Sequence, residues 1–387
     1  MRGLHISSRK NVKMSDAKVA ANQQIGIKVL NRSELEDFIG SPEFEQLPTI
    51  PISTHRALSQ IKNPRAADSD VLLILAYWGT EIVGYLGTMP DLVVISGKKY
   101  RCAVLSCIWV KPEFRKRDVS IKLIGKAHDF YHLIMGTDYV PAIFKMYVRS
   151  GFFSHEYKLE GVRLYMRMDL QSILPPKKKV FKKIKPVLYV GDQVMNVFLD
   201  FRFLISKNRF KPKRLEYVKE VDEEAEKFIS TLQEKQLFKR NCEELNWIIN
   251  NPWILTSPSR DDARYYFDSS DKSFEYRCIK LRDDHNELIA FLLLSKRNRV
   301  LRIPYCYMKP GAVAEVGNAI AYHIYKWKIN TFVTQHPELT SYFLSHNIGQ
   351  IFRKKSYRLY FLSKELDQLL KGIDYEVQDG DADAAFV

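Results

Sequence analysis

Four short segments in the first half of this chain recur, in the same order, in the second half. The members of the pairs are 206, 198, 195 and 195 residues apart, so the spacing is nearly constant. The pairs are 81–88 with 287–294, 109–112 with 307–310, 147–150 with 342–345, and 163–165 with 358–360. One short match can arise by chance, whereas four in register indicate an internal duplication. The chain is therefore expected to fold as two related halves.

Length and composition agree with this division. A chain of 387 residues, 46% hydrophobic and 12% aromatic, can bury two cores, because single domains run to about 150 residues. We expect a flexible N-terminal segment (1–24), a first domain (25–170), a basic linker with an amphipathic helix (171–214), a second domain (215–370) and an acidic, mobile tail (371–387). No apolar run is long enough for a membrane-spanning helix, and residues 1–24 lack the apolar stretch of a secretion signal. A cytoplasmic protein is the expectation.

The segment 108–124 carries the clearest chemical signal. An apolar strand passes through a proline turn and a basic loop directly into a helix. A helix start offers unpaired N–H groups and the positive end of the helix dipole. Arg115, Lys116 and Arg117 lie where an anion would arrive, so the segment is typical of a phosphate site.

This segment resembles motif A of the GNAT superfamily of acyl-CoA-dependent N-acyltransferases, which has the pattern V-x-P-x-[FY]-R-x-x-G-x-G. Val110, Pro112, Phe114 and Arg115 match it. The resemblance implies an α/β fold of the α+β type, with mixed sheets and flanking helices in two tandem GNAT-like domains. It also implies that acetyl-CoA or another acyl-CoA binds here. The residues that it assigns to acyl-CoA are Ile108, Trp109, Val110, Arg115, Lys116, Arg117, Asp118, Val119 and Ser120, the first three through backbone N–H groups of a splayed strand.

Two positions depart from the motif, because Asp118 and Ser120 stand where the family has glycine. A carboxylate repels a pyrophosphate, so Asp118 must turn outward or pair with Arg115 or Arg117. The alternative is an ordinary basic loop, with Asp118 as the helix N-cap and no ligand.

Residues 147–152 match a second family signature, Y-x-x-x-G-F, which implies that Tyr147 protonates the departing CoA thiolate. A phenol with an ordinary pKa near about 10 stays protonated at neutral pH and can act as a general acid. The alternative for Tyr147 is a packed residue near a helix end. No carboxylate lies on the strand 103–110 to act as the base, and Asp91 is a candidate without geometric support. Residues 142–146 are either a fifth strand or part of the next helix, after a helix expected over 119–134.

The second half lacks the basic loop. After Pro310 the sequence contains no Arg or Lys up to Asn318 and has Glu315 where a phosphate would lie. The resemblance therefore implies a degenerate GNAT-like half that shapes the substrate cleft. The five cysteines show no zinc spacing, so we expect reduced thiols and no metal.

Positive charge is concentrated between the halves. The formal net charge is +15, and residues 175–215 alone hold nine Lys and three Arg against two Asp. Six of the lysines precede an apolar segment: Lys177, Lys178, Lys179, Lys182, Lys183 and Lys185. Such a cluster is typical of a weak contact with an anionic membrane surface. A solvated linker whose apolar helix packs between the two halves accounts for the same residues and is the favoured interpretation. No nucleic-acid-binding module is recognised, so no nucleic-acid partner is expected.

Together these features predict an N-acyltransferase that moves an acyl group from acyl-CoA to an amine of a small-molecule or sugar-like acceptor. Two alternatives stay open. One is a non-catalytic, GNAT-derived binding or scaffold protein that has lost CoA through Asp118 and Ser120. The other is a peripheral-membrane acyltransferase acting on envelope intermediates.

Overall fold

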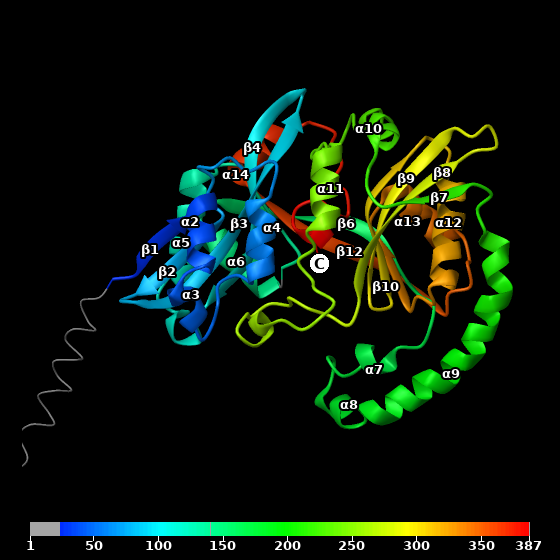
Figure 1. Cartoon of the computed structure of the whole chain (residues 1–387), viewed down its shortest axis with the longest axis horizontal. Coiled ribbons are helices and arrows are strands. Elements are labelled where there is room, and N and C mark those ends of the chain that lie inside the picture. Colours follow the sequence, from blue (N-terminus) through cyan, green and yellow to red (C-terminus); the bar gives the residue numbers. More distant parts are fainter. Residues whose placement is uncertain (1–23, 140, 387) are drawn as a thin grey trace, which may run out of the picture.

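The computed structural model describes residues 24–139 and 141–386, so all but one residue of the predicted N-terminal segment 1–24 lies outside the described residues. Twelve strands of the described chain form one sheet, in the order β1-β2-β3-β4-β5-β12-β6-β11-β10-β9-β8-β7 (Figure 1). The strands are β1 (Gly26–Leu30), β2 (Leu73–Trp78), β3 (Glu81–Ile95), β4 (Lys98–Val110), β5 (Ile134–Thr137), β6 (Phe153–Tyr165), β7 (Leu215–Val218), β8 (Phe274–Arg282), β9 (Leu288–Arg297), β10 (Val300–Met308), β11 (Thr331–Thr334) and β12 (Phe352–Ser363).

The sheet repeats one topology outward from its centre. On one side β4 and β5 are parallel and β3, β2 and β1 follow as an antiparallel meander. On the other side β10 and β11 are parallel, followed by the meander of β9, β8 and β7. This symmetry agrees with the internal duplication and with the expected mixed sheet.

The two central strands join the halves. Strand β12 comes from the end of the second half, yet it lies between β5 and β6 and pairs with both. Strand β6 comes from the first half and pairs with β11 of the second. Because the sheet is continuous across the centre, the domain limits at 170 and 215 stay a prediction.

Helices cover both faces of the sheet in the first half. Successive side chains of strand β2 point to opposite faces, and the apolar ones are buried on both. Leu73 and Leu75 point into a core that contains residues of α2 and α4, whereas Ile74 and Ala76 pack against α5 on the other face. The helices of this half are α2 (Arg32–Ile39), α3 (Pro42–Gln46), α4 (Thr54–Ile61), α5 (Val119–Phe130) and α6 (Pro141–Arg149).

Helix α5 is shorter than predicted. The expected helix over 119–134 ends at Phe130, because Tyr131 is extended and Ile134 already belongs to β5. Parallel pairing with β4 takes these residues out of the helix, although their apolar spacing continues the helical pattern. Residues 142–146 lie within α6, so the strand alternative for them is wrong.

The second half and the connection to it contain α7 (Leu170–Ile173), α8 (Lys179–Lys183), α9 (Lys185–Ser206), α10 (Glu223–Ser230), α11 (Cys242–Asn250), α12 (Val313–Lys326), α13 (Pro337–Ser345) and α14 (Lys364–Leu370). Helix α9 runs along the outside of the molecule (Figure 1). The expectation that its apolar residues pack between the halves is wrong, because Phe198 and Phe201 are 69% and 67% exposed. Within 24–139 and 141–386, every helix is too short or too polar to span a bilayer.

The second part of the acidic tail, 378–386, is largely buried, which corrects the interpretation of the tail as a mobile end. Phe386 is 1% exposed, and its ring stacks on Trp253 at a centroid distance of 4.5 Å. Asp381 is 1% exposed and lies 3.5 Å from the guanidinium of Arg240. The charged pattern of the tail indicated solvent exposure, but a buried arginine stabilises the carboxylate inside the protein.

Candidate active site

A notch opens in the sheet where β4 and β5 separate. Their parallel pairing covers only Ala103–Leu105 against Ile134–Gly136, while β4 continues to Val110. Cys107 has a left-handed backbone, with φ of 55°, at a shift in the pairing with β3. Such a bulge re-aims the strand. The predicted backbone donors Ile108, Trp109 and Val110 therefore lie on a strand section that has left its parallel neighbour.

The basic loop follows this section. Residues Pro112–Phe114 form a short 3-10 turn, and α5 begins at Val119. The guanidinium of Arg117 lies 4.8 Å from the centre of the Trp78 ring, and Nε of Arg115 donates to the carbonyl of Val110 at 3.3 Å. Arg115, Lys116 and Arg117 are all exposed, so their charges are available to an anion.

Asp118 has a backbone conformation that favours glycine. Its φ of 54° and ψ of 21° are left-handed, a conformation that glycine adopts readily. Its carboxylate lies 3.2 Å from Arg149, not from Arg115 or Arg117, and is 60% exposed. Asp118 occupies the N-cap position of α5, as the alternative predicted, but its side chain makes no capping hydrogen bond. The first N–H groups of α5 therefore receive no cap from this side chain.

The two remaining loop residues differ in their surroundings. Val119 is fully buried and belongs to the core beneath α5, so only its backbone N–H is in a position to contact a ligand. Ser120 is half-buried in the first turn of the helix. The assignment of both to acyl-CoA stays a prediction.

Tyr147 lies in α6 and is packed, with 4% of its surface exposed. Its ring is 4.3 Å from that of Phe361 and 5.4 Å from that of Phe153. Burial raises the pKa of the Tyr147 hydroxyl, and the nearby Asp383 and Cys107 act in the same direction. The hydroxyl thus stays protonated at neutral pH. Packing and a role as proton donor are compatible here.

Asp383 is the acidic residue that sequence reasoning missed. Its carboxylate accepts hydrogen bonds from the hydroxyl of Ser106 on β4 and from that of Thr137 at the end of β5, the latter at 3.1 Å. It therefore bridges the two sides of the notch. No local signal marked it, because Asp383 reaches the notch from a tail more than 240 residues away in sequence.

Arg56 of α4 contacts the Ser106 hydroxyl, to which Asp383 is also bonded. Its guanidinium donates to the Ser106 hydroxyl at 2.7 Å and to the hydroxyl of Tyr265 at 3.1 Å, and it lies 3.8 Å from the centre of the Trp253 ring. A buried cation next to Ser106 fixes the orientation of the hydroxyl that contacts Asp383.

Asp91, the base considered from the sequence, is not available. It is 3% exposed and forms ion pairs with Arg65 at 2.5 Å and with Arg240 at 2.9 Å. Although burial opposes its ionisation, the two arginines hold the pKa of Asp91 below its ordinary value. Both its oxygens are engaged in the core, so Asp91 is structural.

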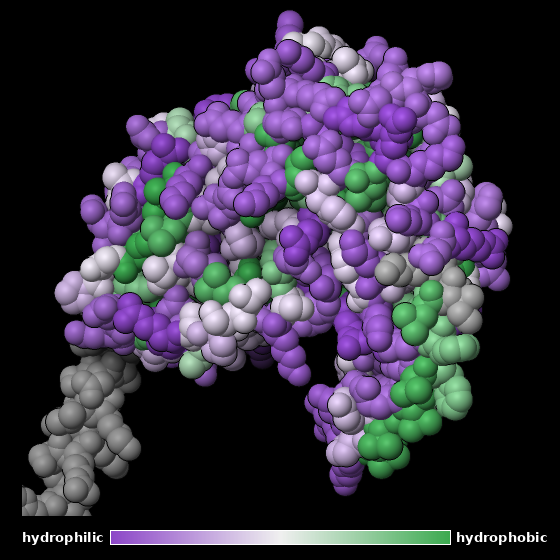
Figure 2. Space-filling view, turned by 45° about the vertical axis from the view of Figure 1, so that its right-hand side comes forward, coloured by the Kyte–Doolittle hydropathy of each residue, from purple (hydrophilic) through white to green (hydrophobic). Residues whose placement is uncertain are grey.

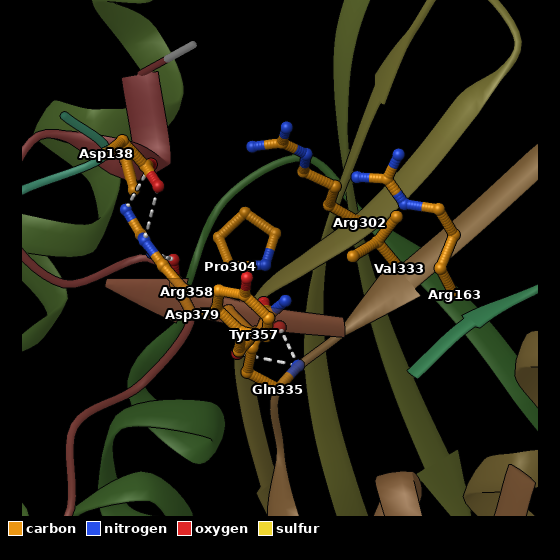
Figure 3. Close-up of a pocket in the computed structure, with 10 residues that line it drawn as sticks. Asp138, Arg163, Arg302, Pro304, Val333, Gln335, Tyr357, Arg358 and Asp379 are labelled. Atoms are coloured by element: carbon orange, nitrogen blue, oxygen red, sulfur yellow. Dashed lines mark hydrogen bonds and ion pairs between the residues drawn. The ribbon is translucent and has the colours of Figure 1, made fainter. Parts of the chain in front are cut away.

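A cavity of about 90 Å³ adjoins the notch (Figure 3). Asp138 follows Thr137 along the chain and Ala384 follows Asp383, and both line this cavity. The other lining residues are Arg163, Arg302, Pro304, Val333, Gln335, Tyr357, Arg358 and Asp379. The two spaces therefore share the end of β5 and the tail.

The cavity is rich in guanidinium groups. Arg358 is engaged by Asp138 at 2.8 Å, whereas in the described chain neither Arg163 nor Arg302 forms an ion pair. In Figure 3 dashed lines join Asp138 to Arg358, and none joins it to Arg163 or Arg302. The pKa of Arg302 is lowered, chiefly by loss of solvent around the guanidinium and also by the positive charges of Arg358 and Arg163. The carboxylates of Asp138 and Asp379 raise the pKa of Arg302 and so oppose this shift in part. Two unpaired cations close together are suited to binding a carboxylate or a phosphate.

Among the described residues, no three His, Cys, Asp or Glu side chains gather as a metal site requires, and the expectation of no metal stays a prediction.

The sequence matches no protein-family model, and no curated protein matches it significantly. Solved structures are similar in fold. One is a conserved protein of Enterococcus faecalis V583 described as a "Probable N-Acyltransferase", with a TM-score of 0.51 and 11% identity over 90% of this chain and 74% of that one. An N-acetyltransferase of Anabaena variabilis gives 0.49 and 11% over 88% and 72%, and Saccharomyces cerevisiae N-myristoyltransferase with bound myristoyl-CoA gives 0.46 and 12% over 94% and 84%.

The similarity to the Enterococcus protein shows that the two chains share a fold, and at 90% coverage it extends over both halves of this chain. At 11% identity it shows the fold alone, so the activity has to be argued from the site.

Proposed function

We propose that this protein is an N-acyltransferase that moves an acyl group from acetyl-CoA or another acyl-CoA to an amine of a small-molecule or sugar-like acceptor. The observation that carries the proposal is the Asp383 carboxylate, held between Ser106 and Thr137 in the notch between β4 and β5. It supplies the base that the sequence of β4 lacks, next to a strand section and a basic loop suited to acyl-CoA.

The proposed chemistry assigns one step to each group. The Asp383 carboxylate takes a proton from the acceptor ammonium, and the neutral amine attacks the thioester carbonyl. Backbone N–H groups of residues 108–110 stabilise the negative oxygen that forms. The C–N bond forms first, and the C–S bond breaks as the carbonyl re-forms, with Tyr147 giving its proton to the departing thiolate. The second proton that the nitrogen loses as the amide forms restores the Tyr147 hydroxyl, and Asp383 releases its proton to solvent. Acyl-CoA supplies the thioester, and the uncapped start of α5 with Arg115 holds its pyrophosphate.

The arginine cavity supports an acceptor that carries an anionic group besides its amine. Arg163 and Arg302 are free to bind a carboxylate or phosphate, and the cavity shares the segments Thr137–Asp138 and Asp383–Ala384 with the notch. An acceptor anchored there would direct its amine toward Asp383. Charge reversal by Arg302→Glu should raise KM for an acidic amine by about tenfold or more and affect a neutral amine less.

Calorimetric titration with acetyl-CoA and longer acyl-CoAs tests the donor assignment. We expect micromolar binding that Arg115→Ala weakens about tenfold, with an unchanged melting temperature. Asn318→Ala in the corresponding part of the second half is the matched control and should bind like the wild type. Release of free thiol with a panel of amines then tests the reaction. A chain that binds no acyl-CoA would be the non-catalytic binding protein instead.

A further inference from the structure

Helix α9 turns its polar residues toward the protein. The carboxylate of Asp192 accepts from the N–H groups of Leu170 and Gln171 at 3.0 and 2.9 Å. The Asn196 amide bonds to both the N–H and the carbonyl of Met168, at 2.9 and 2.8 Å. One turn further, Asp200 lies 2.9 Å from Arg167. Hydrogen bonds and an ion pair therefore attach the inner face of α9 to residues 167–171. In a soluble protein the inner face of a helix ordinarily packs apolar side chains against the core.

The apolar face of α9 points to solvent. Seven residues, each between 54% and 69% exposed, are spaced so that they share one side of the helix: Val187, Val190, Val194, Val197, Phe198, Phe201 and Leu204. Figure 2 shows a green band along the outer side of the arm that α9 forms, with hydrophilic residues at its inner side. A continuous exposed apolar surface of this kind marks a site of interaction.

Positive charge flanks this band. Lys177, Lys178 and Lys179 precede it, and Lys182, Lys183 and Lys185 lie at its start, all six exposed. The two acidic residues of 175–215, Asp192 and Asp200, belong to the inner face. The lysines therefore lie at the N-terminal end of the exposed apolar face, and neither Asp192 nor Asp200 belongs to that face.

We propose that α9 and the preceding lysines dock the protein onto an anionic lipid surface, with the apolar face in the interfacial region and the lysines on the lipid phosphates. The charge pattern favours this occupant. A second copy of the chain bound through the same face would bring a second set of lysines to the contact, where like charges repel, whereas anionic lipids attract both sets. The helix lies along the surface, since it is not apolar enough to cross it. This proposal does not depend on the reaction.

Vesicle flotation of the full chain tests the proposal. We expect the protein to float with vesicles of phosphatidylcholine and phosphatidylserine, and less with phosphatidylcholine alone. The double variant Phe198→Ser with Phe201→Ser should weaken partitioning by about a hundredfold, because two buried aromatic rings are lost. Replacing the six lysines by Gln should weaken it by at least about tenfold and remove the preference for anionic vesicles.

A matched control is Phe130→Ser with Phe352→Ser, two rings 46% and 59% exposed elsewhere on the molecule. It should float like the wild type, and thermal melting should show that all variants are folded. Wild-type protein that stays unbound to anionic vesicles would overturn the proposal. So would a dimer in sedimentation velocity that dissociates in the Phe198 and Phe201 variant while flotation is absent, since the face would then bind a second copy.

Discussion

The two halves of the sheet contain the same notch, but the tail fills it differently. In the first half β4 and β5 separate after Leu105, and the Asp383 side chain reaches between them. In the second half β10 and β11 separate after Arg302, and main chain and side chains of residues 378–380 occupy the opening. The Gly380 N–H donates to the carbonyl of Pro304 at 2.6 Å, and the Gln378 side chain accepts from the N–H of Cys306 at 2.9 Å.

One short segment thus serves two purposes. In the second notch it satisfies the backbone groups that the separated strands expose, which makes a structural joint. In the first notch it adds one carboxylate and leaves the neighbouring basic loop accessible. The equivalent helix start in the second half carries Glu315 in its first turn, which disfavours an anion there. The same separation of two parallel strands can thus form a candidate site in one half and a structural contact in the other, depending on which tail residues occupy it.

The sharpest test of this comparison removes the charge of one tail acid at a time. Asp383→Asn should lower kcat by about 10²–10⁴-fold, because the proposed base is lost. Asp381→Asn, at the residue that directly follows the segment 378–380 of the second notch, should change stability but leave kcat within about threefold. Steady-state kinetics with thermal melting distinguishes the two. Equal kcat values for both variants would mean that the first notch has no special role.

The two related tyrosines provide the next test. Tyr147→Phe should lower kcat by about tenfold to a hundredfold at an unchanged affinity for acyl-CoA, because the proton for the thiolate is lost. Tyr342, its counterpart in the duplication, should tolerate the same change. Rapid-quench turnover and calorimetry measure the two quantities. Full turnover by Tyr147→Phe would reduce this residue to its packing role.

The second notch should influence stability through pH. Burial raises the pKa of Asp379 to about 6 against opposing contacts from Gln335 and Arg358. The folded protein then binds a proton more tightly than the unfolded chain, whose Asp pKa is about 3.9, so stability should rise as pH falls from about 7 to about 5, by about 1–2 kcal/mol.

Denaturant unfolding at several pH values measures this slope. Asp379→Asn should flatten it in part, and the further change Asp381→Asn should flatten it more, because burial also raises the pKa of Asp381 to about 6. A slope that is unchanged in the double variant would place its origin elsewhere.

The smallest effect is expected at the loop. Asp118→Gly removes a negative charge and relieves a left-handed backbone with φ of 54°, so acyl-CoA should bind several-fold more tightly. Lys328→Gly, at φ of 51° in the second half, relieves a similar strain and should alter only stability. Equal affinities for wild type and Asp118→Gly would show that the carboxylate already lies clear of the ligand.

Much of the fold could be predicted from patterns local in sequence. The turn between β2 and β3, the strand that enters the basic loop and the start of α5 at Val119 agree with expectation. The end of α5 at Phe130 could not be predicted, because the apolar residues up to Ile134 continue the helical spacing. Ile134 belongs to β5 instead, because β5 pairs with β4. The prediction that the apolar face of α9 packs against the protein was wrong. Periodicity shows that a helix has an apolar and a polar face, but it does not show which of the two the protein covers.

The sequence by itself predicted two related halves of mixed α/β structure and an exposed basic loop before α5, because periodicity, turn residues and charge act over a few neighbouring positions. Only the tertiary structure decided where Asp91 and Asp383 belong. Both are aspartates in unremarkable surroundings along the chain, yet Arg65 and Arg240 confine one to the core, and Ser106 and Thr137 hold the other in the notch. Their roles depend on partners brought together from distant segments, and no local pattern encodes those contacts.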